Sequence, residues 1–161
     1  MNDAVSAIPK GFHTLTPHIV VRDARKAADF YHQAFGAELM GLSVGPDGKV
    51  MHAQVRIGDS YLMFGDEYPE WNAPSPSTTK ADTCVRLHLY VEDVDKVFEA
   101  AVAAGAQVVM AVTTQFWGDR YGQVVDPFGH RWSVATHVKD LTQEEMKAAA
   151  EQAMAKMASG T

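Results

Sequence analysis

One sequence pattern occurs twice in this chain. The first copy reads HIVVRDARKAADFYHQAFGA from His18, and the second reads HLYVEDVDKVFEAAVAAGA from His88. In both copies a histidine opens an apolar run that ends in valine, and a charged residue and an aspartate follow. A repeat of this kind marks one supersecondary unit per copy, and neighbouring units bury a shared core. The repeat therefore predicts two modules with the same fold.

The aspartate in each copy predicts the start of a helix. Asp23 and Asp93 have short side chains whose oxygens accept hydrogen bonds from the free N–H groups of a first helical turn. Gly36 and Gly105 predict the helix ends, because glycine readily adopts the left-handed conformation of a C-terminal cap. Apolar residues lie between them at helical spacing. They are Ala27, Phe30, Tyr31, Ala34 and Phe35 in the first copy and Val94, Val97, Phe98, Ala101 and Val102 in the second.

Three runs typical of β-strands follow each predicted helix. Turn residues separate these runs, most clearly Pro46-Asp47-Gly48, Gly58-Asp59 and Asp126-Pro127-Phe128-Gly129. The pattern predicts an α+β fold of two tandem βαβββ modules. The expected strands are 38–44, 50–57 and 60–64 in the first copy, and 107–112, 123–125 and 131–136 in the second.

The order of these elements predicts the organisation of the chain. Proline, serine and threonine are frequent between the two copies, which is typical of a linker. The expected parts are an N-terminal tail at 1–13, module one at 14–66, a linker at 67–83, module two at 84–140 and a C-terminal helix at 141–161.

The C-terminal segment carries the signals of a helix. Thr142 and Glu145 have the spacing of a capping box. Met146, Ala150 and Met154 continue as an apolar stripe that reaches Met157. The stripe predicts a helix that packs on its own domain or, alternatively, contacts a second copy in a dimer. A third alternative is that this methionine-rich face binds another partner.

Charge and composition exclude several classes of function. The net charge of −6 provides no basic patch for phosphates, which argues against nucleic acid or a membrane surface as partner and favours a small neutral or cationic ligand. Cys84 is the single cysteine, so an intrachain disulfide and a cysteine-based zinc site are excluded. No run approaches the roughly 20 apolar residues of a membrane span, and the N-terminus lacks a signal-peptide pattern. We therefore expect a cytoplasmic protein.

Alternation along the predicted strands sorts their side chains into two faces. In the second copy Leu87 and Leu89 form an apolar face, while Arg86, His88 and Tyr90 form a polar one. Helices on one side of a sheet would bury the apolar set. The polar set then either faces water or lines a concavity. Residues with the same expected position in other strands are His52, Gln54 and Arg56, Tyr61 and Met63, and Arg131 and Ser133.

The repeat and several short motifs together resemble the vicinal-oxygen-chelate superfamily, which includes glyoxalase I, extradiol dioxygenases and bleomycin-resistance proteins. The chain is most similar to its PhnB-like branch, and the resemblance covers residues 14–140. It implies that the two modules form a curved mixed sheet around a central cup that holds a small molecule. The motifs are residues 48–53 (GKVMHA), 87–93 (LHLYVED), 115–120 (QFWGDR) and 126–130 (DPFGH).

The resemblance also implies where a metal would bind. Metal-dependent members place a ligand on the first and the fourth strand of each module. Aligned on Asp23 and Asp93, these positions hold Thr16 and Arg86 on the first strands and fall near Met63 and Ser133 on the fourth. An oxygen-preferring divalent metal needs carboxylates that these positions lack. We therefore expect a metal-free site.

Three histidines leave a metal site open as an alternative. His18 and His88 occupy matching positions in the two copies, and His52 has the same expected face. Three imidazoles bind zinc, nickel or iron. Otherwise these histidines are hydrogen-bonded in a polar pocket. For His130, in a turn, and His137, at a strand end, capping or solvation is the expectation.

The segment from Gln115 to Tyr121 has the most distinctive binding chemistry. Phe116, Trp117 and Tyr121 provide flat apolar area, and Arg120 provides a cationic fork for a carboxylate or phosphate. The alternative is a structural lid in which Arg120 pairs with Asp119 or Asp126.

These observations predict a homodimeric small-molecule binding protein that sequesters or senses a small aromatic-containing metabolite or drug without a metal cofactor. The alternative is a metal-dependent lyase or dioxygenase that uses His18, His52 and His88. The expected ligand-binding residues are His18, His52, Gln54, Met63, Arg86, His88, Tyr90, Gln115, Phe116, Trp117, Arg120 and Ser133.

Overall fold

A computed structural model describes residues 5–159, so the first residues of the expected tail and the last two of the expected C-terminal helix lie outside the described part. Module one forms a four-stranded mixed sheet in the order β1-β4-β3-β2, in which β1 is parallel to β4 and the other pairs are antiparallel. Its elements are β1 (His18–Val21), α1 (Ala24–Phe35), β2 (Glu38–Val44), β3 (Val50–Ile57) and β4 (Ser60–Asp66).

Module two repeats this topology with the strand order β5-β8-β7-β6. The α+β fold of two tandem βαβββ modules is thereby confirmed. The largest difference from the prediction is that β7 begins at Asp119 rather than at Gln123, while β4, β6 and β8 end one or two residues later than predicted. The elements are β5 (Arg86–Tyr90), α3 (Val94–Ala103), β6 (Gln107–Thr114), β7 (Asp119–Val125) and β8 (Arg131–His137).

Both repeated helices start at their expected caps. Asp23 accepts a hydrogen bond from the backbone N–H of Lys26, and Asp93 accepts one from that of Lys96. Gly36 ends α1 in the left-handed conformation with φ of 65°. The cap of α3 is Ala104, and Gly105 follows it at φ of 110°. Local sequence therefore determines both helix starts.

The expected linker contains two short helical turns, a 3-10 helix at Pro69–Trp71 and α2 at Pro76–Thr79. Both start with proline, whose fixed φ suits a first helical position. Glu67 anchors this segment by accepting hydrogen bonds from the backbone N–H of Ser75 and the hydroxyl of Thr78.

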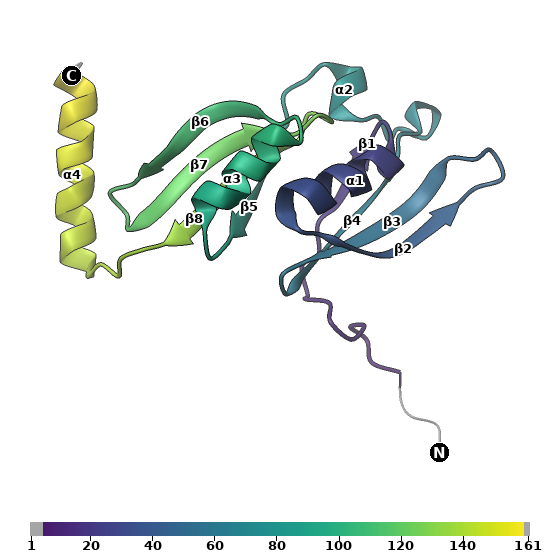
Figure 1. The fold of residues 1–161 in the computed structure, drawn as a ribbon, viewed down its shortest axis with the longest axis horizontal. Coiled ribbons are helices and arrows are strands. Elements are labelled where there is room, and N and C mark those ends of the chain that lie inside the picture. Colours follow the sequence, from purple (N-terminus) through teal and green to yellow (C-terminus); the bar gives the residue numbers. More distant parts are fainter. Residues whose placement is uncertain (1–4, 160–161) are drawn as a thin grey trace.

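The two modules meet through their helices, since α1 and α3 lie side by side between the two sheets (Figure 1). The buried carboxylate of Asp126, in the turn before β8, joins them. It accepts hydrogen bonds from the Tyr31 hydroxyl of α1 at 3.0 Å and from the Trp132 indole of β8 at 3.0 Å. His130 lies beside it, with Nε2 2.9 Å from the backbone oxygen of Val20. His130 is therefore a buried link between modules, and the expectation of capping or solvation for it is wrong.

The C-terminal helix α4 (Gln143–Ser159) is confirmed, and its capping box forms as expected between Thr142 and Glu145. It stands at the end of the molecule beyond β6, away from module one (Figure 1). No residue of α4 is buried, and Met154 and Met157 are exposed. Of the helices in residues 5–159, none combines the length and apolar character that crossing a bilayer requires.

Candidate functional site

Each sheet has one face covered by a helix and one face that no helix covers, which we call the outer face. In module one, alternate residues of β3 such as Ala53 and Val55 are buried against α1. The residues between them, His52 and Gln54, therefore point to the outer face. The same alternation holds for module two, where Val124 of β7 belongs to the core.

The outer face of module one brings together four of the expected binding residues. Met63 of β4 lies in register with His18 of β1 and Gln54 of β3, so these three form a row across the sheet. The His18 and His52 rings meet edge to face, with centroids 5.8 Å apart. Burial and the neighbouring His52 lower the pKa of His18, which favours its neutral imidazole.

The outer face of module two carries an aromatic and polar cluster. His88 lies in register with Ser133 and through it with Gln123, which forms one row across β5, β8 and β7. The His88 ring packs edge to face on Tyr90 with a centroid distance of 4.5 Å and parallel to Tyr121 at 6.0 Å. Its Nδ1 lies 2.7 Å from the Ser133 hydroxyl, which fixes the plane of the imidazole. These side chains are thus held before any ligand arrives.

A buried carboxylate organises one end of this cluster. Asp119, only 4% exposed, accepts hydrogen bonds from the Tyr90 hydroxyl at 3.1 Å, the Trp117 indole at 3.0 Å and His137 Nδ1 at 2.8 Å. The other ring nitrogen of His137 lies 3.0 Å from a carboxylate oxygen of Asp140. Because both ring nitrogens face carboxylates, both donate, and His137 is held as a cation.

These contacts determine the charge state at this end of the face. Burial opposes ionisation of Asp119, but hydrogen bonds from His137, Tyr90 and Trp117 outweigh it and lower its pKa. Hydrogen bonds to Asp119 and Asp140 raise the pKa of His137. Burial and the bond to Asp119 raise the pKa of Tyr90, so its hydroxyl stays protonated. Since that proton points at Asp119, the Tyr90 oxygen is left as an acceptor for a ligand.

Arg86 lies at the opposite end of the same face. Its Nη1 is 3.4 Å from the Tyr121 hydroxyl, which is a long hydrogen bond. Burial lowers the pKa of His88, and the charge of Arg86 also lowers it, while Asp119 acts in the opposite direction. The face therefore has the guanidinium of Arg86 at one end, the Asp119–His137 pair at the other and aromatic rings between them.

The turn between β6 and β7 positions Trp117. Gly118 has a φ of 99°, and a Cβ atom there would lie 2.2 Å from the backbone oxygen of Lys139. Only glycine fits, because the residues after β8 pass directly over this turn. Gln115 and Phe116 lie on the other side of the turn, where Gln115 bonds Thr113 and both line a hollow of about 400 Å³ beside α4. Gln115 is not part of the outer-face cluster, whereas the Phe116 ring packs edge to face on Trp117 with a centroid distance of 5.1 Å.

Arg120 lies on the helix side of the sheet. Its guanidinium makes two hydrogen bonds to the carboxylate of Asp95 in α3, at 2.6 and 2.7 Å. Neither expected partner, Asp119 or Asp126, is the one observed. Because neighbouring β7 residues point to opposite faces, Arg120 faces α3 while Asp119 faces outward, and the structure does not bring Arg120 to the candidate site.

The largest cavity described, about 1250 Å³, is a groove that follows the free edge of β5. One side is formed by residues 85–93, and the other by residues 57–62 of the β3–β4 hairpin with residues 15–17. We call it the β5 groove. Arg86, His88 and Tyr90 belong both to this groove and to the outer face, so a ligand in either place meets them.

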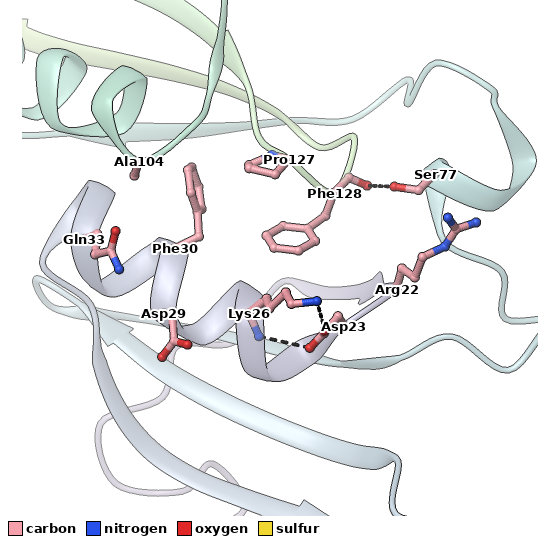
Figure 2. A pocket seen from close by; sticks show the side chains of 10 residues that line it. All are labelled: Arg22, Asp23, Lys26, Asp29, Phe30, Gln33, Ser77, Ala104, Pro127 and Phe128. Carbon is pink, nitrogen blue, oxygen red and sulfur yellow. Dashed lines mark hydrogen bonds and ion pairs between the residues drawn. The ribbon is translucent and has the colours of Figure 1, made fainter.

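A smaller hollow of about 470 Å³ lies between α1 and the turn before β8, and we call it the α1 hollow (Figure 2). Phe30 of module one and Phe128 of module two meet there with ring centroids 6.2 Å apart. Lys26 at its rim is paired with Asp23 at 2.9 Å and Arg22 with Glu67 at 3.4 Å, whereas the rim residue Asp29 takes part in no ion pair within residues 5–159. None of the expected binding residues lines the α1 hollow.

The residues at the family's metal positions do not fit a metal. The positions hold Thr16, Met63, Arg86 and Ser133, and the guanidinium of Arg86 would repel a cation. His18 and His52 are neighbours, whereas His88 lies in module two against Ser133 and Tyr90. In residues 5–159 of one chain, no three histidine, cysteine, aspartate or glutamate side chains are grouped so that they could hold a metal.

Sequence reasoning underestimated two residues of the cluster, Asp119 and His137, and it named Tyr121 only as apolar area. The predicted strand begins only at Gln123, because Gly118 and Gly122 interrupt the strand-like pattern before it. The signal that would have found them is period two: Asp119, Tyr121 and Gln123 alternate in the same phase. His137 was expected to be capped or solvated, and instead it binds two carboxylates.

Comparison with known proteins agrees with this architecture. The sequence profile of the Glyoxalase/Bleomycin resistance protein/Dioxygenase superfamily matches residues 11–134. An uncharacterised protein of Mycobacterium bovis is 46% identical over 137 residues, which are 84% of this chain and 90% of that protein.

Solved structures show the same fold. TioX from Micromonospora sp. ML1 aligns over 78% of this chain and 99% of its own with a TM-score of 0.62 and 26% identity. A PhnB protein from Bacillus cereus aligns over 77% and 99% with a TM-score of 0.61 and 20% identity, a likeness of fold alone. With two βαβββ modules and a profile match over most of its length, this chain belongs to the glyoxalase/bleomycin resistance protein/dioxygenase superfamily.

Proposed function

We propose that this chain is a small-molecule binding protein that sequesters or senses a small aromatic-containing metabolite or drug without a metal cofactor. The carrying observation is the cluster on the outer face of module two, where Tyr90, Trp117 and Tyr121 surround the buried carboxylate of Asp119. Aromatic side chains with fixed polar partners are typical of ligand sites, because they combine apolar area with oriented hydrogen bonds.

The hydrogen bonds within the cluster support binding as its role. Tyr90 and Trp117 are both fixed by Asp119, so their rings lose little conformational entropy when a ligand packs on them. Asp119 already accepts three hydrogen bonds and is held ionised, so it serves as a positioning residue.

We also propose a cytoplasmic homodimer with the domain division derived from the sequence: module one at 14–66, linker at 67–83 and module two at 84–140. Exposed apolar side chains on the outermost strands support a second copy as partner, because such patches mark interaction surfaces. They include Leu39, Met40 and Val44 on β2 and Val108 and Val109 on β6.

A thermal-shift and tryptophan-fluorescence screen against small aromatic compounds tests the proposed function. A binder of the cluster is expected to raise the melting temperature and to quench the fluorescence of Trp117. In the variant Tyr90→Ala, the affinity should fall about tenfold or more, because one ring of the site is lost. Trp71→Ala, which removes an exposed aromatic side chain of the linker, is the matched control. Equal affinity in both variants would place the ligand elsewhere.

The metal-dependent lyase or dioxygenase remains the second candidate, and the observation that favours it is the His18–His52 pair at 5.8 Å. Elemental analysis of untagged protein separates the two candidates. Zinc, nickel or iron at one equivalent per chain, lost in both His18→Ala and His52→Ala, would replace the metal-free proposal. A metal content that these variants leave unchanged would count against the enzyme.

A further inference from the structure

Within residues 5–159 Arg86 has no acidic partner, as is also true of the exposed Arg25 on α1, whereas four other arginines are ion-paired. Among residues 5–159, the ion pairs of arginine are Arg22 with Glu67, Arg56 with Glu38, Arg120 with Asp95 and Arg131 with Asp82, and Arg86 takes part in none. Its one hydrogen bond goes to the neutral hydroxyl of Tyr121 at 3.4 Å. A guanidinium with most of its five donors unused is suited to bind an anion bidentately.

The surroundings of Arg86 strengthen its attraction for an anion. Arg131 is its register partner on β8, so two guanidinium groups stem from one row of the parallel strands. Arg131 forms an ion pair with Asp82 at 3.1 Å, but its positive charge still lies directly across the sheet from Arg86. Like charges in this arrangement are unfavourable. His88 lies in the next row. It brings no negative charge near Arg86, and its ring provides an N–H donor.

The rest of the outer face gives the ligand an orientation. Between Arg86 and Asp119 lie the rows of His88 with Ser133 and of Tyr90 with Tyr121. Asp119 already accepts hydrogen bonds from His137, Tyr90 and Trp117, whereas Arg86 has free N–H donors, so an anion is directed to the Arg86 end. An aromatic ring attached to that anion then lies along the His88, Tyr90 and Tyr121 rings.

We infer that Arg86 is the anion-binding residue of this site and that the ligand is a small aromatic carboxylate, with its carboxylate on the Arg86 guanidinium and its ring on the Tyr90 side of the face. This inference rests on the proposed function and narrows it to one ligand class. The net charge of −6 does not oppose it, because screening confines the relevant field to groups within about 10 Å.

A matched pair of probes tests this inference. Benzoate and benzamide have the same ring and nearly the same shape, but only benzoate is charged. Their affinities are measured by chemical-shift titration on the wild type and on Arg86→Gln, Arg86→Lys and Arg120→Gln. The spectra report at the same time that each variant is folded. Arg120→Gln is the control, because it removes an arginine that faces α3.

The wild type is expected to bind benzoate about tenfold more tightly than benzamide. Arg86→Gln should remove this preference and Arg86→Lys should restore only part of it, since lysine lacks the planar fork. Arg120→Gln should keep it. Equal affinities for both probes that Arg86→Gln does not change would overturn the inference and leave the proposed aromatic site standing.

A third probe separates the inference from the function on which it rests. If acetate binds at Arg86 as tightly as benzoate, the anion site is confirmed and the aromatic part of the proposed function is wrong. If none of the three probes shifts the signals of Arg86, Tyr90 or Trp117, both are overturned.

Discussion

At the scale of single residues, the most informative group is the chain of hydrogen bonds from Asp140 through His137 to Asp119. It connects an exposed carboxylate to a buried one that fixes Tyr90 and Trp117. The histidine is therefore part of the support of the aromatic cluster, although its own side chain is half exposed. A charge change at His137 is transmitted to the site through Asp119.

The pKa of His137 predicts a pH dependence of stability. Its pKa in the folded protein is raised above 6.5, so its stabilising contribution is fully present below pH 6.5 and is lost as the pH rises through the folded value. The free energy of unfolding of His137→Gln, measured with urea from pH 5.5 to 9, should differ most from the wild type at low pH. The exposed His13→Gln is the control. A difference that is constant with pH would show that His137 is not held as a cation.

At the scale of elements, the repeated sequence specifies the fold of each module but not how the two modules pack against each other. The packing of the modules depends on the contact between α1 and α3 and on the turn before β8. In that turn Asp126 accepts a hydrogen bond from the Tyr31 hydroxyl of α1. The two residues are 95 positions apart in the chain. The Asp126 carboxylate is only 3% exposed and needs each of its hydrogen-bond donors, because an unpaired buried charge is strongly unfavourable.

Tyr31→Phe removes one donor from Asp126 and keeps the ring. It should lower the free energy of unfolding by about 1.5–3 kcal/mol, the range for a buried hydrogen bond to a charged group. Urea unfolding measures the change. Tyr61→Phe is the matched control, because the Tyr61 hydroxyl donates no hydrogen bond within the described residues, and we expect a change below about 0.5 kcal/mol. Equal losses in both variants would contradict a special role of the Asp126 contact.

The element-level predictions from sequence succeeded where signals are local. The strands at 38–44 and 50–57 begin and end as expected, and Asp23 and Asp93 cap their helices. They failed at β7, where strand structure depends on pairing with β8: Asp119 lies opposite His137 and Tyr121 opposite Ala135. This pairing joins residues up to 18 positions apart across the turn, and the strand prediction did not follow the period-two signal past the glycines.

At the scale of the whole molecule, both sheets leave their outer faces uncovered by helices. The outermost strands, β2 and β6, expose apolar side chains there and at the edges. A second copy that covers these surfaces would also enclose the aromatic cluster. Binding and assembly would then depend on each other.

Light scattering after gel filtration tests the assembly. The expected mass is twice the 17.6 kDa of one chain at micromolar concentration. The double variant Leu39→Lys and Met40→Lys should lower this mass if β2 contributes to the contact, and Val138→Lys, an exposed apolar position outside β2 and β6, is the control. A single-chain mass for the wild type would contradict the proposed dimer.

The sequence by itself determined what depends on neighbours in the chain. The repeat, the caps and the alternation predicted two βαβββ modules, the faces of their strands and the helix after Thr142, because backbone hydrogen bonding and side-chain period are local properties. It also predicted the place of Arg86, His88 and Tyr90 on one face.

Only the tertiary structure decided which distant side chains meet. It placed Asp95 rather than Asp119 or Asp126 beside Arg120, joined His18 to His52 but not to His88, and put His130 on Val20 of the other module. It also left Arg86 without a carboxylate among residues 5–159. The physical reason is that contacts across sheets and between modules depend on register and docking, which no run of neighbouring residues encodes.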